Sequence, residues 1–358
     1  MDYRGREKKL AERLRAARLD ACLVTHLPNI RYLCGFTGSA GVLAVAGSKL
    51  AFFTDGRYTT QARAEVKGAR VVVGKRAALT EALAWLKRQR VRRLGFEAEH
   101  VPFALYRHLS GEAGKMRLVP MPGVIERLRM IKEREEVEQI RAAILLASGL
   151  FDHLLNTIKP GVKESDVAAE LEHAARRDGA EGMSFETIVA SGLRSALPHG
   201  RASAQPIQKN GFVILDFGVI LAGYCSDMTR TIYVGAPGKR PTELYRAVLD
   251  AQLAAIASVS PGKTVGEVDQ AARFRLQKAG LGRYFTHSTG HGVGLEIHEP
   301  PRVAKGQAEP LEPGMVITVE PGVYLPDEGG VRIEDVVVVT QNGCEVLTPT
   351  TKELIALE

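Results

Sequence analysis

Two aspartates stand in an apolar, β-rich stretch of the second half of the chain. Phe212–Val234 reads as a hairpin in which two β-rich runs flank a glycine-containing turn. Asp216 and Asp227 are 11 positions apart, and across an even-numbered loop that separation places both side chains on one face, opposite or diagonal. Two carboxylates so close repel each other and lose hydration, so a fold tolerates them if they share a proton or bind a cation. The alternative for this pair alone is two exposed aspartates on a solvated sheet face.

A second apparent hairpin, Met315–Val339, carries one carboxylate in each arm. Glu320 ends an apolar run just before a proline, and Glu334 lies within the next run. Their separation of 14 fits placement on the same face only if the loop has an odd number of residues. Asp335 would point to the opposite face, where we expect a solvated side chain.

A glycine- and histidine-rich segment, Thr286–Pro301, lies between these hairpins. Glycine lets the backbone approach a ligand or another chain segment closely. His291 is framed by glycines and is a natural nitrogen ligand, His298 lies seven positions later, and His287 could be structural. The glycines alternate with bulkier residues: Gly290, Gly292 and Gly294.

Four carboxylates and one imidazole could together hold two divalent ions. An oxygen-rich site with one or two histidines suits Mn²⁺, Co²⁺ or Zn²⁺ better than copper. Two adjacent metal ions can activate a water and polarise a carbonyl, which is the chemistry of amide hydrolysis.

Other chemistries lack their accompanying residues. Asp216–Gly218 spells DFG, but no kinase catalytic loop accompanies it, and neither a GxxxxGK[ST] loop nor an HExxH helix occurs. The four cysteines form no CxxC pair and read as reduced thiols of a cytoplasmic protein. No apolar run is long enough to span a bilayer, so we expect no membrane partner.

The elements that position these residues divide into two domains. Residues 1–125 alternate strand-like and helical stretches, which predicts a small α/β domain with a largely buried sheet. Residues 126–358 form the second domain, with a linking helix over 126–160. We find no repeat of solenoid length, and two hairpins are thin evidence for a duplicated half-domain. Further helices are expected over Glu164–Asp178, Glu243–Val259 and Val265–Ala279.

Charge is distributed unevenly between the two domains. Residues 1–125 hold 23 Lys and Arg against 10 Asp and Glu, whereas residues 126–358 hold 25 against 31. The basic charges are interspersed in an ordinary αβ pattern without a recognisable nucleic-acid-binding motif, so we expect a solvated face and no nucleic-acid partner. The acidic second domain suits carboxylates that bind cations.

The motifs ALPHG, ILDFG…SDMTRT, STGHGVGLEIHEPPR, ITVEPGVY and GGVRIEDVVVV stand in a familiar order. With them the chain resembles the proline-specific members of the methionine-aminopeptidase-like metallopeptidases, prolidase (Xaa-Pro dipeptidase) and aminopeptidase P. PNIRYLCGFTGSAG and FTDGRYTTQA resemble the N-terminal domain of prolidases, aminopeptidase P and creatinase. The resemblance spans nearly the whole chain and implies an α+β "pita-bread" catalytic domain with pseudo-twofold symmetry.

The resemblance also implies roles for individual residues. Asp216 would chelate one metal ion and His291 the other, while Asp227 and Glu334 bridge the two. Glu320 would bind the second ion and carry a proton from the attacking water to the leaving nitrogen. The remaining matches are substrate-contacting residues: His199 and His298 at the scissile amide, Arg302 at a substrate carboxylate, Arg332 beside Glu334, and Phe185 in the proline pocket.

The predicted function is therefore hydrolysis of the Xaa-Pro bond at the N-terminus of dipeptides or short peptides, by a manganese-dependent homodimer. Arg302 and the short chain favour dipeptides over longer peptides. The alternatives are a creatinase-like hydrolase and a non-catalytic peptide-binding protein on the same fold. Relatives of both kinds have lost metal ligands, whereas this chain keeps all five.

Overall fold

A computed structural model describes all 358 residues of the chain. It contains two compact units, Met1–Arg129 and Met130–Glu358. The division falls within helix α6 (Val124–Met130), so the predicted boundary between residues 125 and 126 lies near the start of that helix. No helix is both long and apolar enough to cross a membrane.

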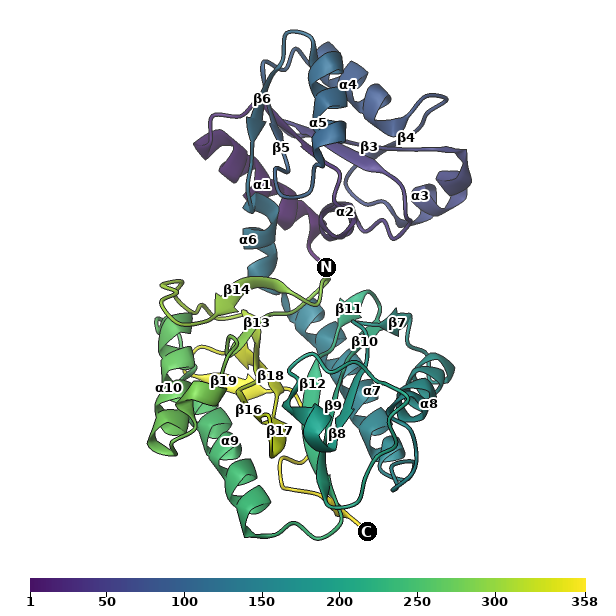
Figure 1. Cartoon of the computed structure of the whole chain (residues 1–358). Coiled ribbons are helices and arrows are strands. Elements are labelled where there is room, and N and C mark those ends of the chain that lie inside the picture. Colours follow the sequence, from purple (N-terminus) through teal and green to yellow (C-terminus); the bar gives the residue numbers. More distant parts are fainter. The chain divides into compact units, whose positions relative to one another are not determined.

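The N-terminal unit is built on one six-stranded sheet, ordered β4-β3-β2-β1-β5-β6 (Figure 1). The antiparallel strands β1, β2 and β3 carry parallel strands at both sides, β4 against β3 and β5 against β1. The short apolar runs of the sequence form these strands, because both faces of the sheet are largely buried. The strands are β1 (Ala21–Val24), β2 (Val42–Ala46), β3 (Lys49–Thr54), β4 (Arg70–Val73), β5 (Arg93–Phe96) and β6 (Arg117–Pro120).

Helices cover this sheet with apolar stripes at helical spacing. In α4 the buried residues Leu79, Leu83 and Leu86 recur every three or four positions and pack against the strands. The helices are α1 (Tyr3–Ala16), α2 (Leu27–Cys34), α3 (Thr59–Glu65), α4 (Ala78–Arg88) and α5 (Phe103–Ala113).

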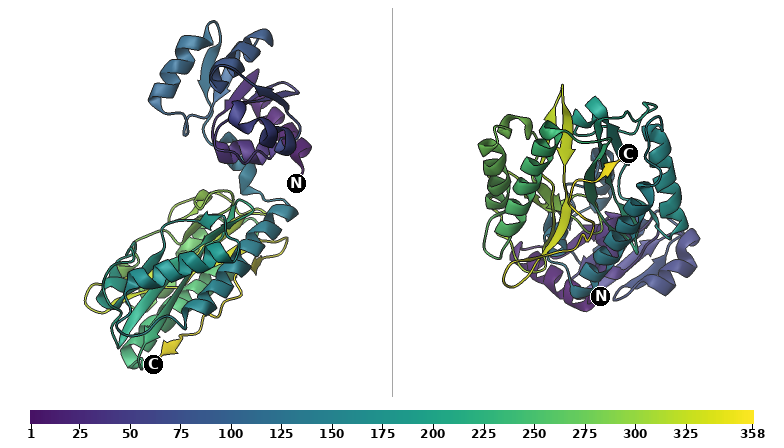
Figure 2. Two further views of the ribbon diagram at one scale, coloured as in Figure 1. Left: turned by 90° about the vertical axis from the view of Figure 1, so that its right-hand side faces the viewer. Right: turned by 90° about the horizontal axis from the view of Figure 1, so that it is seen from below.

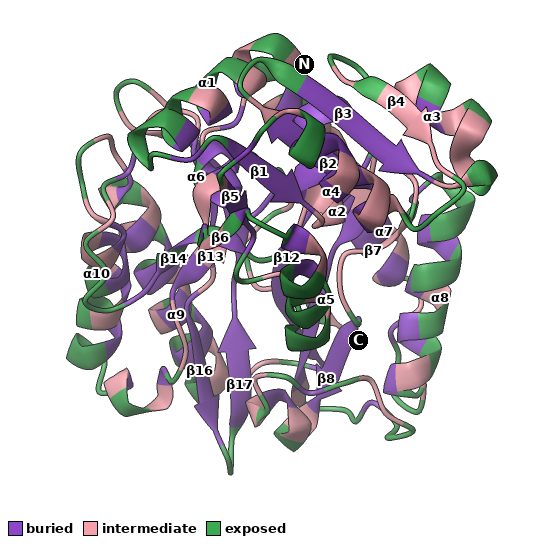
Figure 3. Cartoon of the chain, turned by 90° about the horizontal axis from the view of Figure 1, so that it is seen from above, coloured by how far each residue is buried: buried purple, intermediate pink, exposed green.

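The C-terminal unit consists of two similar halves, each with a pair of helices outside and strands inside (Figures 1 and 2). The first half carries α7 (Arg134–Leu154) and α8 (Glu164–Arg177), and the second carries α9 (Lys239–Ser258) and α10 (Val265–Lys278). Both halves bury an apolar core between helices and strands. In Figure 3 inner strands such as β8, β16 and β17 are buried, while α8 and α10 alternate buried and exposed residues.

Two main sheets form the inside of this unit, ordered β20-β12-β9-β8 and β14-β13-β15-β18-β19. A three-stranded sheet, β11-β10-β7, and the hairpin β16-β17 complete it. The strands are β7 (Gly182–Met183), β8 (Ile188–Ser191), β9 (Gly211–Phe217), β10 (Val219–Leu221), β11 (Tyr224–Cys225), β12 (Met228–Val234), β13 (Gly290–Gly292), β14 (Glu299–Val303), β15 (Val316–Val319), β16 (Gly322–Leu325), β17 (Gly329–Arg332), β18 (Asp335–Val339), β19 (Cys344–Val346) and β20 (Ala356–Leu357).

The prediction of one continuous helix over residues 126–160 is wrong. The helical segment is broken between α6 and α7, where Ile131 forms a β-bridge with Met315 and the amide of Lys132 donates to the carbonyl of Gly314 at 2.9 Å. A capping box between Glu133 and Glu136 then starts α7. The backbone leaves the helix here because its hydrogen-bonding groups pair with the second half of the unit.

Candidate active site

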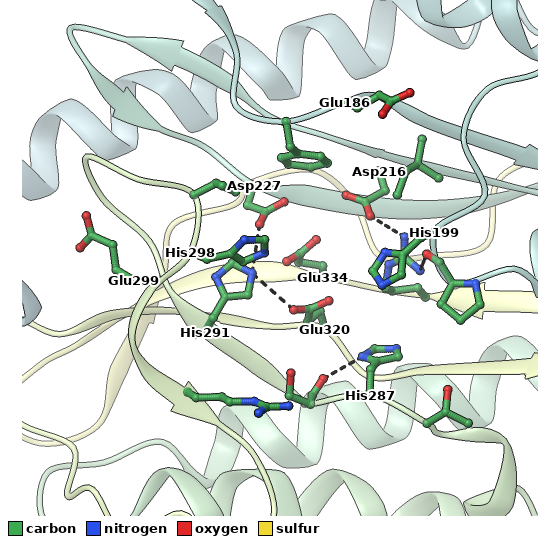
Figure 4. A pocket seen from close by; sticks show the side chains of 18 of the residues that line it. Glu186, His199, Asp216, Asp227, His287, His291, His298, Glu299, Glu320 and Glu334 are labelled. Atoms are coloured by element: carbon green, nitrogen blue, oxygen red, sulfur yellow. Dashed lines mark hydrogen bonds and ion pairs between the residues drawn. The ribbon is translucent and has the colours of Figure 1, made fainter. Parts of the chain in front are cut away.

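A cavity of about 980 Å³ opens in the C-terminal unit and receives side chains from both halves (Figure 4). All ten residues predicted from the sequence line it: Phe185, His199, Asp216, Asp227, His291, His298, Arg302, Glu320, Arg332 and Glu334.

The first half supplies two aspartates from one antiparallel hairpin, Asp216 within β9 and Asp227 directly before β12. β9 pairs with β12 so that Asp216 faces Thr229. Asp227 precedes Thr229 by two positions, and it therefore lies diagonally across from Asp216 on the same face, as the odd spacing predicts. Both side chains are at least 88% buried, although they are charged in water.

The second half supplies two glutamates from one long hairpin. β15 pairs with β18, and β16 with β17, in a single register in which Val319 faces Asp335 and Gly322 faces Arg332. The same register sets Glu320 opposite Glu334, between the two strand pairs. The connecting loop has three residues, 326–328, so it has the odd length that same-face placement requires.

His291 reaches the carboxylates from the short strand β13. Its Nε2 lies 3.5 Å from Asp227 Oδ2 and 3.5 Å from Glu320 Oε1, while Nδ1 lies 3.0 Å from the carbonyl oxygen of Gly292. The flanking glycines are required by close packing, because a Cβ at Gly290 or Gly292 would overlap backbone carbonyls of neighbouring strands.

The side chains converge on one region in which charge is costly (Figure 4). Burial, with the neighbouring charge of Glu334, raises the pKa of Asp227 well above its ordinary value. Burial also raises the pKa of Glu334, and that of Glu320 to about 8. Burial lowers the pKa of His291 to about 4, so that its imidazole is neutral at pH 7.

These features fit a divalent-metal site. Ligand atoms of Asp227, His291 and Glu334 lie within 4.8 Å of one another. Asp216 Oδ1 is buried and accepts no hydrogen bond, so one carboxylate oxygen has no partner within the protein. A cation would supply that partner, offset the repulsion among the carboxylates and bind the neutral imidazole.

Arg332 joins the two halves at this site. Its Nη2 donates to Asp216 Oδ2, its Nη1 donates to the hydroxyl of Tyr324 at 2.6 Å, and its Nε donates to Thr229 Oγ1 at 3.2 Å. Thr229 in turn donates to Glu334 Oε2 at 2.7 Å. Sequence reasoning missed Thr229 and Tyr324; the placement of Thr229 opposite Asp216 in the hairpin was the available signal.

The remaining histidines occupy different environments around the cavity. The ring of His298 lies edge-on to that of His291, with centroids 4.4 Å apart. His287, for which the sequence leaves a structural role open, also lines the cavity, and its Nε2 hydrogen-bonds with the hydroxyl of Tyr324 at 2.9 Å. His199 is exposed on the loop that follows β8.

The expectation that Asp335 is solvated is wrong. Asp335 does point away from Glu334, but it is fully buried and accepts hydrogen bonds from Arg230 at 2.8 Å and Lys352 at 2.6 Å. Alternation predicts the face of a side chain; it does not predict that the C-terminal segment covers that face.

A second group of carboxylate and histidine ligands lies in the N-terminal unit, at Glu99, His100 and Glu126. Internal hydrogen bonds account for two of its three members: Glu126 Oε1 accepts from Asn29 Nδ2 and lies 2.9 Å from His100 Nε2. The ring of His100 is stacked on that of His26 with centroids 3.6 Å apart. We assign no metal to this group.

The fold and the buried donor set of the C-terminal unit are those of a metal-dependent hydrolase. Residues 138–341 match the model of metallopeptidase family M24, and residues 6–131 match the creatinase/prolidase N-terminal domain. The chain therefore belongs to metallopeptidase family M24, which confirms the family and the fold class predicted from the sequence.

Similar proteins span the full chain. An uncharacterized peptidase of Bacillus subtilis, YqhT, is 44% identical over 95% of this chain and 96% of its own length. A Xaa-Pro dipeptidase of Pyrococcus horikoshii is 38% identical over 97% of this chain and 98% of its own. The solved structure of a Xaa-Pro dipeptidase from Bacillus anthracis has a TM-score of 0.97 and 42% identity, and the match covers 99% of this chain and 100% of the other.

Proposed function

We propose that this protein is a metal-dependent peptidase that hydrolyses the bond between an N-terminal residue and a following proline. The observation that carries the proposal is the convergence of four carboxylates and a neutral imidazole from both halves on one cavity. The names of the similar proteins support the Xaa-Pro bond as the target.

Five residues of this chain would hold a pair of divalent ions. Asp216 would bind one ion and His291 the other, with Glu320 beside His291, and Asp227 and Glu334 between the two. Bound metal would supply a Lewis acid that polarises the scissile carbonyl and lowers the pKa of water. The oxygen-rich donor set favours Mn²⁺, with Co²⁺ or Zn²⁺ as alternatives.

The side chains of this chain would do the remaining work. Glu320 would accept a proton from the attacking water and pass it to the nitrogen of the departing proline. His199 and His298 would donate hydrogen bonds at the scissile amide as charge develops there. Arg332 fixes Asp216, and, through Thr229, Glu334, so that neither carboxylate must reorganise during the reaction.

The amide itself explains why such a site can accept proline. An Xaa-Pro amide has no N–H, so a site that makes no hydrogen bond to an amide N–H at this position binds this bond without a missing contact. Phe185 would form an apolar wall for the ring, and Arg302 would bind the carboxylate that a dipeptide presents directly after proline. We therefore propose dipeptides as the preferred substrates and, from the family resemblance, a homodimer as the working assembly.

Turnover of a small substrate panel tests the proposal. Protein loaded with Mn²⁺ should release proline from Ala-Pro, cleave Ala-Pro-Ala more slowly and leave Ala-Ala intact. EDTA should abolish the activity, and added Mn²⁺ should restore it. A protein that binds metal but turns over no Xaa-Pro peptide would refute the assignment, and faster cleavage of Ala-Pro-Ala would reverse the preference for dipeptides.

A further inference from the structure

Glu164 is a fully buried carboxylate that the proposed reaction does not use. It is the first residue of α8, and its oxygens contact the end of β8 and the segment between β8 and β9. Oε1 accepts from the amide of Ser191 at 2.7 Å and from its hydroxyl at 2.8 Å. Oε2 accepts from the hydroxyl of Ser203 at 2.6 Å, from its amide at 3.2 Å and from Arg194 Nε at 3.0 Å.

These contacts fasten both ends of one loop, residues 192–202, to a single carboxylate. Ser191 precedes the loop and Ser203 follows it, so the carboxylate of Glu164 ties the two ends to one point, beside the backbone bonds that pair Ser191 with β9 and Ser203 with Ser165. Arg194 adds a bond inside the loop, where its Nη2 donates to the carbonyl of Arg201 at 2.7 Å. The loop is thus held as a closed unit, although much of its surface is exposed.

His199 lies in this loop, close to its C-terminal end, and lines the cavity (Figure 4). No hydrogen bond or ring contact within the protein holds its imidazole, so the position of the ring depends on how the loop backbone is held. The loop meets the site at the preceding residue, where the carbonyl of Pro198 accepts from Arg332 Nη1 at 3.1 Å.

We propose that Glu164 is a positioning residue that holds His199 at the cavity through the loop 192–202. The inference rests on the proposed function for the role of His199, but the loop anchoring can be measured without turnover. A carboxylate suits this place because it only accepts hydrogen bonds, and all five groups around it are donors. Glu164→Gln keeps the shape of the side chain but turns an amide NH₂ towards one set of donors.

The second half of the unit offers a matched control. Asp269 in α10 is also fully buried, is paired with Arg273 at 2.6 Å and accepts from Thr289 Oγ1 at 2.8 Å. Arg273 donates to the carbonyl of His287, so this pair holds a different histidine-bearing segment. Asp269→Asn makes a similar change to a buried anchor without touching the loop of His199.

Hydrogen exchange of the metal-loaded protein tests the anchoring. Glu164→Gln should speed exchange about tenfold or more in amides 192–203 and leave amides 286–291 unchanged, because the loop opens locally. Asp269→Asn should do the reverse. Unchanged exchange in 192–203, or an equal increase in both segments, would overturn the inference. Ser203→Ala, which removes one bond from the same carboxylate, replaces Glu164→Gln if that variant does not fold.

A double-mutant cycle tests the consequence for His199. Glu164→Gln should lower kcat about tenfold with KM within about threefold and metal content unchanged, yet cost less than about twofold in a His199→Ala background. Asp269→Asn should cost the same factor in both backgrounds. Equal losses from Glu164→Gln in both backgrounds would assign Glu164 a structural role only. A wild-type protein without Xaa-Pro turnover would refute the proposed function, and the exchange experiment would still decide the anchoring.

Discussion

The two halves of the C-terminal unit share a backbone frame but contribute different chemistry. In each, a Pro-Gly turn leads into the second helix, at Pro160-Gly161 and at Pro261-Gly262. The same backbone bonds follow: Gly161 N donates to the carbonyl of Ile207 at 2.8 Å, and Gly262 N to that of Leu311 at 2.9 Å. Corresponding bonds fasten the first turns of both helices: Glu164 to Gln205, Ser165 to Ser203, Val265 to Glu309 and Gly266 to Gln307.

The side chains that reach the cavity do not repeat in this way. The first half gives two aspartates placed diagonally across β9 and β12, whereas the second gives two glutamates opposite one another and the imidazole of His291. The anchoring carboxylates also differ in place, since Glu164 begins its helix and Asp269 lies one turn inside its own. A duplicated frame therefore fixes where the strands meet, and single substitutions on it decide what each half contributes.

The largest effect on activity should come from removing one of the proposed metal ligands from each half. Asp227→Asn and His291→Ala should each lower kcat/KM at least about 10³-fold, because a group that supports transition-state charge is lost. Both variants should also bind less metal, measured by elemental analysis after dialysis. If the site draws on both halves, the two losses are comparable.

Asp250→Asn is the control for this comparison, since it removes an exposed carboxylate of α9 outside the cavity. It should keep wild-type activity and metal content. Full metal content in Asp227→Asn, together with loss in His291→Ala, would place the whole site in the second half and break the proposed division.

Spacing predicted which carboxylates share a face of a hairpin, because side chains alternate between the two faces of a β-strand. The separation of 11 between Asp216 and Asp227 placed both on one face, and β9 and β12 pair accordingly. For Glu320 and Glu334 parity alone leaves the placement open, because the placement depends on the length of the connecting turn, which has three residues. Local periodicity predicts which face of a strand each side chain occupies, but it does not predict the length of an irregular turn.

What the sequence did not reveal depends on contacts between distant segments. The repeat is visible afterwards, since Pro160-Gly161 and Pro261-Gly262 are 101 positions apart and Gly179 and Gly280 end the two helical segments at the same spacing. The buried contacts that Glu164 and Asp335 each make with their own basic partners could not be predicted either. Those partners lie more than fifteen positions away in the sequence.

The next effect concerns the bond that joins the halves behind the site. Arg230, in β12 of the first half, donates to Asp335 and to the carbonyl of Glu334 in the second. Arg230→Met should lower the free energy of unfolding by about 3–5 kcal/mol, because a buried charge is left with fewer partners. Chemical denaturation measures this. Arg240→Met, which breaks the exposed pair with Glu328, should lower the free energy of unfolding by at most about 1 kcal/mol. Equal losses in the two variants would show that the buried contact of Arg230 between the halves contributes no more than an exposed ion pair.

A smaller effect should appear in the pH dependence of the metal-free protein. The folded pKa values of Asp227, Glu334 and Glu320 lie above those of the unfolded chain, the last at about 8. The fold therefore binds protons more tightly than the unfolded state, and stability is lost as pH rises towards 8. The lowered pKa of His291 acts in the opposite direction, but only below its unfolded value near 6.5.

Between about pH 6.5 and 8 these three carboxylates, and not His291, should determine how stability changes with pH. The free energy of unfolding should fall by up to about 1.4 kcal/mol per pH unit for each proton that the folded state retains. Thermal unfolding of EDTA-treated protein should show Tm falling over this range, and saturating Mn²⁺ should flatten the curve. Glu320→Gln should reduce the slope in the metal-free protein. A metal-free Tm that rises from pH 6.5 to 8 would contradict the burial of these carboxylates.

The smallest effect contrasts the starts of the two second helices. Thr264 caps α10 in a capping box with Glu267, whereas Lys163 precedes α8 and offers no side-chain cap. Thr264→Ala should therefore cost about 1 kcal/mol in denaturant unfolding, and Lys163→Ala less than about 0.5 kcal/mol. In the first half the buried carboxylate of Glu164 ties the helix start to the loop, so a side-chain cap has less to add there. Equal costs for the two variants would mean that the helix starts are held alike, and that the two halves differ only at the cavity.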